Sequence, residues 1–167
     1  MTVQANHEEV AESLRRAARR FATGVTVVAA ADGHGVHAMT ANSFVSLSLR
    51  PPLVGVAVQV GGRLRPLTER VLHFGISVLS ESQRDYADHY AWRERNGASP
   101  DLAFSMTGHP SSVPLISECV AYFVCELRSV HPVGDHELIV GSVLECGACC
   151  PARAPLVFVD GRFRSGR

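Results

Sequence analysis

The sequence contains no lysine, and its sixteen basic residues, all of them arginine, are balanced by sixteen acidic residues. A chain without net charge has no overall field that would draw it to nucleic acid or to an anionic membrane surface. Long apolar runs are also missing, since the longest, 24–31 and 53–58, fall far short of the ~20 residues that cross a bilayer. We therefore predict neither a nucleic-acid-binding protein nor a membrane protein.

The amino terminus lacks the basic-then-apolar pattern of a signal peptide, so we expect a cytoplasmic protein. The five cysteines are an odd number in a chain long enough to fold without disulfides, and we interpret them as reduced thiols. Cys146, Cys149 and Cys150 include a C-x-x-C spacing that a metal site or a redox pair can use. Because no second such pair completes four zinc ligands, we predict loop thiols there and no metal.

The composition that is present, 46% hydrophobic and 19% charged over 167 residues, is that of one compact domain. No internal repeat or linker divides the chain, so we assign residues 1–167 to a single domain. Apolar residues at helical spacing predict an amphipathic amino-terminal helix over about 7–22. From about 24 to 163, short β-branched runs separated by turns predict a barrel.

Predicted strands outnumber predicted helices in this barrel region. We expect strands at 25–31, 36–40, 44–49, 53–58, 74–79, 119–131, 136–145 and 155–159. Short helices are expected at 63–72 and 81–92, and residues 96–114, rich in Gly, Ser and Pro, are expected to form a surface loop. Turns recur too often for alternating strands and helices, so the predicted fold is mainly β, a β-barrel with peripheral helices.

One segment between two predicted strands combines small side chains with free backbone groups. Thr40, Ala41, Asn42 and Ser43 can approach a planar heteroaromatic ring closely and hydrogen-bond its edge through backbone N–H and C=O groups. The alternative is an ordinary Asn/Ser turn between strands. The spacing alone favours the turn, and the longer context decides for the ring-binding interpretation.

Several segments in fixed order carry a resemblance to a known family. They are Phe21–Val28, Met39–Phe44, Ser46–Leu49 with Pro51–Val54, Phe74–Leu79 with Gln83, Gly134–His136, Gly141–Val143 and Pro155–Phe158. Together they resemble the flavin reductase family with the FMN-binding split β-barrel fold, over about residues 20–163. Members of this family are typically the small reductase components that supply reduced flavin to two-component monooxygenases.

The resemblance implies an NAD(P)H:flavin oxidoreductase that binds FMN or FAD along Thr40–Ser43 and takes a hydride from NADH or NADPH. It also implies a homodimer and a separate flavin-dependent monooxygenase as partner. Hydride transfer to flavin N5 is the chemistry of the cofactors, and the protein supplies position. Two alternatives remain: a flavin-binding or flavin-carrier protein without turnover, and a metal-bound barrel that uses the cysteines near 146–150.

Two more regions are candidates for the site. His136 follows a Gly-Asp turn, and the resemblance places it beside the flavin where nicotinamide docks, although an exposed turn histidine is the alternative. For the flavin phosphate, the glycine-rich segment before a predicted helix offers backbone amides and charge. Its candidates are Gln59, Gly62, Arg63 and Arg65. The family commonly has Ser and Thr hydroxyls here, so the choice between FMN and FAD stays open.

Overall fold

The computed structural model of the chain describes residues 2–91, 104–107, 112–150 and 152–166. Its first half contains α1 (Thr2–Ala18), β1 (Thr23–Gly24), β2 (Thr26–Asp32), β3 (Gly35–Ala41), β4 (Val45–Leu49), β5 (Pro52–Gln59) and α2 (Leu64–Val71). Next come β6 (His73–Val78), the 3₁₀ turn η1 (Glu81–Gln83), α3 (Arg84–Ala91), β7 (Phe104–Met106) and β8 (Pro114–Ile116). The last strands are β9 (Ala121–Val133), β10 (His136–Ala148), β11 (Leu156–Val159) and β12 (Arg162–Ser165).

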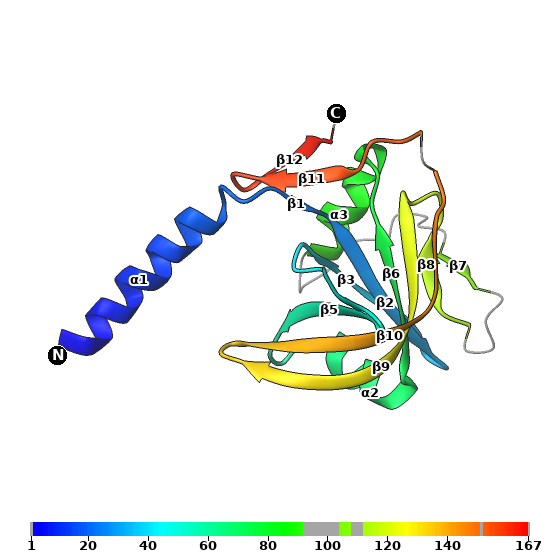
Figure 1. Cartoon of the computed structure of the whole chain (residues 1–167), viewed down its shortest axis with the longest axis horizontal. Coiled ribbons are helices and arrows are strands. Elements are labelled where there is room, and N and C mark those ends of the chain that lie inside the picture. The colour runs from blue at the N-terminus through cyan, green and yellow to red at the C-terminus, as the bar shows by residue number, and fades with distance from the viewer. Residues whose placement is uncertain (1, 92–103, 108–111, 151, 167) are drawn as a thin grey trace.

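Seven antiparallel strands form the main sheet in the order β3-β2-β6-β9-β10-β5-β4. Its two edge strands, β3 and β4, are consecutive in the chain and are joined only by residues 42–44. A flat sheet would separate these edges by about 29 Å, whereas such a link spans at most about 14 Å. The sheet therefore rolls up until its edges meet at residues 42–44 (Figure 1).

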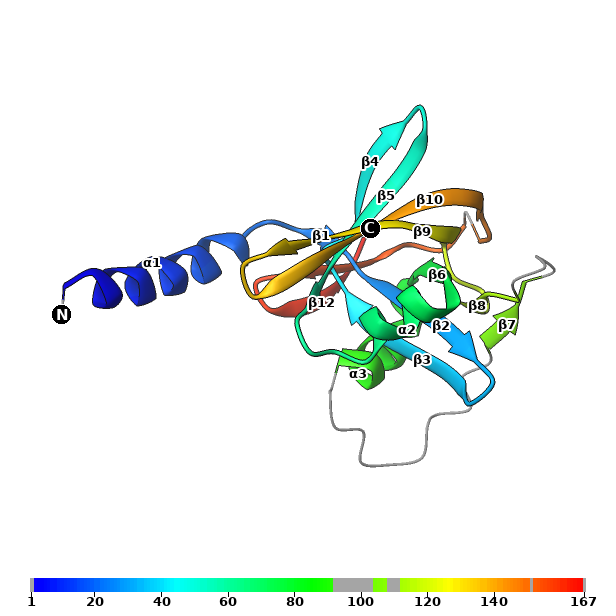
Figure 2. The same cartoon turned by 90° about the horizontal axis from the view of Figure 1, so that it is seen from below.

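Strand β2 is buried on both faces and separates two apolar clusters. Val28 and Ala30 belong to the cluster that takes in Leu64 and Leu67 of α2, while the alternate residues of β2 belong to the cluster with Ala87 of α3. Successive side chains of a strand point to opposite faces, which produces this division. The two short helices thus close the barrel from different sides (Figures 1 and 2).

Strands β9 and β10 form a hairpin that is long for a globular domain, thirteen residues in each strand. A register shift lies between Val140 and Gly141 of β10. A Cβ atom at Gly141 would lie 2.7 Å from the ring of Phe74, so only glycine allows this close packing. The hairpin therefore bends onto the core, and its tip at Val133–His136 reaches the end of β5.

The predicted fold class, mainly β with peripheral helices, is confirmed, with differences at the edges. Helix α1 spans Thr2–Ala18 rather than 7–22: no glycine or proline interrupts its start, and i to i−3 bonds such as Phe21 N to Ala18 O tighten its end. The predicted loop 96–114 contains β7 and the start of β8, which pair. Its residues 96–103 and 108–111 lie outside the described part.

Helix α1 runs away from the barrel rather than along it (Figures 1 and 2). Its described apolar residues are exposed, including Val10 and Leu14. Its carboxyl end is fixed to the turn between β11 and β12, where the Asp160 amide donates to the Arg19 carbonyl at 2.7 Å. In the described part of the chain, none of the helices combines the length and the hydropathy that a membrane span requires.

Candidate functional site

A cavity of about 530 Å³ opens where the two edges of the rolled sheet meet. The end of β3 and the link to β4 supply one wall, β5 supplies a second, and the β9–β10 tip supplies a third. The lining residues are Met39, Thr40, Ala41, Asn42, Ser43, Ala57, Gln59, Val133 and His136. Six of these were predicted as site residues from the sequence: the four of Thr40–Ser43, Gln59 and His136.

The hydroxyl groups of the 40–43 segment are occupied in holding the wall together. Thr40 Oγ1 donates to the carbonyl of Ala87 in α3 at 2.7 Å, and Ser43 Oγ donates to the carbonyl of Ala57 in β5 at 2.8 Å. Thr26 of β2 supports the same wall from behind by donating to the Ala41 carbonyl at 2.7 Å. These bonds fix the backbone, so the segment presents a rigid surface of small side chains.

The backbone between β3 and β4 is the polar part of this wall. Asn42 and Ser43 follow the last residue of β3 and precede the first residue of β4, outside the ladders of the described sheets. Their N–H and C=O groups thus have no ladder partner to satisfy them, and a ligand edge can supply hydrogen bonds. The link connects two strands, as the alternative interpretation states, and Asn42 and Ser43 also line the cavity.

The opposite rim of the cavity is formed where β5 and β10 pair. His136 at the start of β10 pairs with Gln59 at the end of β5, and the Val60 amide donates to the Asp135 carbonyl at 3.2 Å. Gly134 lies at the tip with φ of 62°, a left-handed conformation that favours glycine. The turn therefore places His136 at the rim, where its side chain lines the cavity and is also 43% exposed to solvent.

His136 is oriented by its neighbour in the chain. Its Nδ1 lies 2.7 Å from Oδ1 of Asp135, and the hydrogen bond from His136 lowers the pKa of the Asp135 carboxyl below its ordinary value. An Nδ1–H that donates to a carboxylate leaves Nε2 as the second polar atom of the ring. The pair thus holds the ring so that a cavity ligand meets only one of its two nitrogens.

Of the predicted phosphate segment, Gln59 lines the cavity, whereas Gly62, Arg63 and Arg65 lie outside its lining. Gly61 makes the turn with φ of 78°, and the Gly62 amide donates to the Gln59 carbonyl at 3.3 Å. The side chain of Arg65 lies between two carboxylates, 2.9 Å from Glu69 and 3.2 Å from Glu137.

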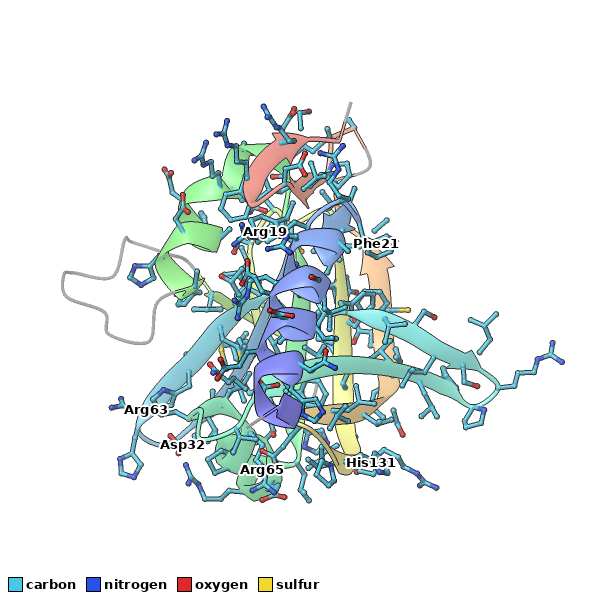
Figure 3. The ribbon with its side chains drawn as sticks, turned by 90° about the vertical axis from the view of Figure 1, so that its left-hand side faces the viewer. Arg19, Phe21, Asp32, Arg63, Arg65 and His131 are labelled. Carbon is cyan, nitrogen blue, oxygen red and sulfur yellow. The ribbon has the colours of Figure 1, made fainter. Side chains whose placement is uncertain are left out.

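Arg63 differs from Arg65 in both exposure and partners. It is exposed at the start of α2, and no ion pair is recorded for it in the described part of the chain. Arg63 and Arg65 both lie at the end of the molecule where β9 carries His131 (Figure 3). Of the two predicted phosphate arginines, Arg63 is therefore the one whose charge is not already neutralised.

Three lining residues were missed by sequence reasoning: Met39, Ala57 and Val133. Met39 and Val133 adjoin predicted site segments, so wider boundaries would have included them. Ala57 lies within an apolar strand and carries no signal of its own. Only the pairing that places Leu138 opposite Ala57 in β5 brings it to this rim.

The cysteines near 146–150 do not form a metal centre in the described part of the chain, where no group of three or more His, Cys, Asp or Glu side chains is arranged to hold an ion. All five cysteines are free thiols. Cys119 and Cys125 are buried, and burial raises the pKa of each thiol to about 12.

The cavity fits a flat heteroaromatic ligand. Its volume lies within the ~300–1,000 Å³ of small-molecule sites, and most of its lining surface is apolar with a few convergent polar groups. Small side chains at Ala41, Ser43 and Ala57 leave the walls free of bulk. The residues present therefore suit an isoalloxazine ring held by backbone groups at its polar edge.

Comparison with known proteins gives a consistent result. Residues 18–167 match the family described as "Flavin reductase like domain". The NADH-dependent flavin reductase StyB of Pseudomonas fluorescens is 37% identical over 89% of this chain and 86% of its own length. The reductase component of 4-hydroxyphenylacetate 3-monooxygenase from Thermus thermophilus is 36% identical over 92% of this chain and 95% of its own.

A solved structure extends the likeness to three dimensions. The NADH:FAD oxidoreductase SgcE6 of Streptomyces globisporus, in complex with NAD and FAD fragments, superimposes with a TM-score of 0.84 at 34% identity. The match covers 93% of this chain and 92% of that one. The rolled sheet described above is thus the predicted split β-barrel.

Proposed function

Since this chain belongs to the family of flavin reductase-like domains, we propose that it is an enzyme that reduces FAD or FMN with NADH. The observation that carries the proposal is the cavity in which the 40–43 wall and His136 face one ligand-sized space. A flavin and a nicotinamide must meet face to face for hydride transfer, and one walled cavity with a histidine at its rim provides this arrangement.

The flavin would be held by the backbone of Asn42 and Ser43 along its polar edge, with Ala41 and Ala57 beside its ring. When bound, the flavin supplies the chemistry by accepting a hydride at N5 from C4 of reduced nicotinamide. The chain's own contribution is position: the bonds from Thr40 and Ser43 fix the wall before a ligand arrives. Preorganised backbone groups lose little entropy on binding.

The nicotinamide would meet His136 at the rim. Asp135 fixes the imidazole through Nδ1, so Nε2 is the atom that can hydrogen-bond the carboxamide of the ring. This contact orients the donor without requiring His136 to exchange a proton. Asp135 is accordingly a positioning residue.

The reduced flavin would pass to a separate flavin-dependent monooxygenase. The relative from Thermus thermophilus is named as the reductase component of such an enzyme, and its length is close to that of this chain. The open rim of the cavity is consistent with a flavin that leaves as a product. A flavin carrier without turnover remains the second candidate, because it would use the same wall.

Anaerobic mixing distinguishes the two candidates. The purified protein is mixed with excess FAD or FMN and then with NADH or NADPH, and loss of oxidised-flavin absorbance is followed. Many turnovers per protein, faster with NADH than with NADPH, are expected. Binding of flavin with no turnover above the protein-free rate would leave only the carrier.

We also propose that the active form is a homodimer. Apolar residues are exposed along α1, where Leu14 is 67% exposed, and on β4, where Leu49 is 84% exposed. The β4–β5 hairpin projects from the barrel, and α1 leaves it altogether (Figure 2). Burying these surfaces against a second copy removes apolar area from water, which favours association.

Sedimentation velocity tests the homodimer. The wild type should sediment as a dimer at micromolar concentration, and Leu49→Asp should shift it toward monomer. Met106→Asp is the matched control, because Met106 is exposed on β7, away from both surfaces. A wild-type monomer with full activity would refute the dimer.

We further propose a cytoplasmic location. Five free cysteines, two of them buried, are typical of a protein kept in a reducing compartment. Cell fractionation with antibodies to the chain would test the location.

A further inference from the structure

Two cysteines that are 30 residues apart in the sequence meet at the open end of the β9–β10 hairpin. The Sγ atoms of Cys119 and Cys149 lie 3.7 Å apart. Cys119 is 2% exposed in the turn before β9, whereas Cys149 is exposed just after β10. The catalytic cavity does not use either side chain.

The backbone around these cysteines is tied together on both sides. The Cys149 amide donates to the Val120 carbonyl at 3.0 Å, and Arg153 forms an ion pair with Glu118 at 3.0 Å. A disulfide needs its sulfurs at about 2.05 Å. Since the two chain segments are already in contact, side-chain rotation can bring the sulfurs together without moving a strand.

The C-x-x-C spacing of Cys146 and Cys149 does not provide such a pair. Cys146 is within β10, where its strand partner is Phe123. Cys125 is fully buried in the apolar cluster that contains Val28 and Leu64. Among the cysteines, all five of which the structure describes, only Cys119 and Cys149 have sulfur atoms recorded in contact.

We propose that Cys119 and Cys149 form a reversible disulfide when the protein meets hydrogen peroxide. The exposed Cys149 thiolate attacks one peroxide oxygen, the O–O bond breaks, and the hydroxide that leaves takes up a proton to become water. Cys149 is then a sulfenic acid. The sulfur of Cys119 attacks the Cys149 sulfur, the S–O bond breaks, and the departing hydroxide takes the Cys119 proton as a second water. Two thiols are oxidised and one peroxide is reduced.

The difference in exposure decides which cysteine attacks the peroxide and which then forms the disulfide. Peroxide reaches Cys149 from solvent, while Cys119 is shielded and has its partner sulfur in contact. Burial, together with the neighbouring Cys149, raises the pKa of the Cys119 thiol to about 12, so Cys119 does not compete for the first attack. The oxidant has a local source, because free reduced flavin reacts with dioxygen to give peroxide. That source rests on the proposed function, whereas the cysteine chemistry does not.

The cross-link would close the hairpin at the end opposite the cavity. Cys149 lies thirteen positions after His136, about 40 Å along an extended strand. A bond between residues 30 apart restricts the unfolded chain, so the oxidised protein should melt at a higher temperature. Flavin reduction should be unchanged, which distinguishes this proposal from the proposed function.

Peptide mapping after oxidation tests the proposal. Wild-type protein is treated with hydrogen peroxide, remaining thiols are alkylated, and the chain is digested without reduction. We expect a cross-linked pair of tryptic peptides, 96–128 with 129–153, that dithiothreitol separates. Cys149→Ser should abolish the pair, and Cys150→Ser, the neighbouring control, should retain it.

The test of the disulfide does not depend on a variant of the buried Cys119. Cys149 is exposed, so its serine variant should fold, and Cys119→Ala is a second check by circular dichroism and cross-linking. Formation of the cross-link in Cys149→Ser would overturn the proposal, because another cysteine would then be the partner. The proposal would also be overturned if, after peroxide treatment, wild type kept five alkylatable thiols or its Cys149 were oxidised to sulfinic acid. A rise in melting temperature in wild type and Cys150→Ser, but not in Cys149→Ser, supports it.

Discussion

Two segments of the chain were predicted to hold the flavin, and they differ in their position relative to the cavity and in their bonding partners. Thr40–Ser43 lies where the sheet edges meet, is fixed by hydrogen bonds that join it to three elements, and lines the cavity. The segment from Gly61 to Arg65 lies beside the cavity, and one of its two arginines is neutralised by carboxylates. Residue type alone did not predict this difference, because an arginine is available to a phosphate only when no nearby carboxylate already pairs with it.

This difference predicts that substitutions in the two segments weaken flavin binding by different amounts. Substitutions in the 40–43 wall should act through shape and be large, because the wall is rigid and close to the ligand. Substitutions in the 61–65 segment should act through exposed charge and be small. Flavin titrations of matched variants test this order.

The largest effect is expected from Ala41→Trp. Ala41 is 7% exposed in the cavity wall, so an indole there occupies the space of the ring. Because the indole and the flavin ring cannot fill the same space, we expect flavin affinity about 100-fold weaker, equivalent to about 2.8 kcal/mol of binding free energy. Fluorescence titration with FAD and FMN measures it, and circular dichroism confirms folding.

Two further variants support the interpretation of Ala41→Trp. Ala41→Leu should weaken binding less than tryptophan does, and Ala152→Trp, on an exposed turn, should leave affinity unchanged. Unaltered flavin affinity in folded Ala41→Trp would show that the ring lies elsewhere.

The sequence predicted the wall better than it predicted the rest of the site. Thr40–Ser43 and His136 carry local signals: small polar residues between strands, and a Gly-Asp turn. Ala57 enters the cavity only through strand register, which no local pattern encodes. Arg65 has one local partner, Glu69 on the same helix, but its second partner, Glu137, is 72 positions further along the chain and reaches it only through the fold.

The same reasoning explains the fold-level results. Strands were predictable because β-branched runs and turns are local, and the main sheet contains most of the predicted strands. The exposure of the apolar face of α1 was not predictable, because periodicity shows which face is apolar but not whether the same chain covers it.

His136→Ala is expected to give the second largest effect, and on a different ligand. The variant loses one hydrogen bond to nicotinamide, so hydride transfer should slow, or the KM for NADH should rise, by about ten-fold, equivalent to about 1.4 kcal/mol. Flavin affinity should stay within about two-fold of wild type, because the wall is intact. Stopped-flow reduction of bound flavin isolates this step from product release.

His131→Ala is the control for that experiment. His131 is exposed on the same hairpin and pairs with Ser129 at 2.8 Å, outside the cavity. The His131→Ala variant should reduce flavin at the wild-type rate. Equal rates in wild type and His136→Ala would remove His136 from the site but would leave the 40–43 wall in place.

A smaller effect is expected from Arg63→Ala. An exposed guanidinium near a flavin phosphate contributes about 0.2–1 kcal/mol, so affinity should fall by about 1.4- to five-fold. Because this contribution is screened by salt, the difference between variant and wild type should shrink as ionic strength rises. Isothermal titration at low and high salt measures both, and an undiminished difference at high salt would contradict the electrostatic explanation.

The smallest effect on flavin binding is expected from Arg65→Ala, although Arg65 is the less exposed of the two arginines. Its guanidinium already lies between Glu69 and Glu137, so a flavin phosphate would have to displace both carboxylates. Affinity should change less than two-fold, while the free energy of unfolding falls by about 0.2–1 kcal/mol through loss of the ion pairs.

Urea unfolding and flavin titration of Arg65→Ala, Glu137→Gln and the double variant separate these quantities. If the ion pair is the role of Arg65, the two single losses of stability will not add in the double variant. Weaker flavin binding in Arg65→Ala than in Arg63→Ala would reverse the comparison, because the phosphate would then lie on the Arg65 side of the cavity and the carboxylates would have to move when flavin binds.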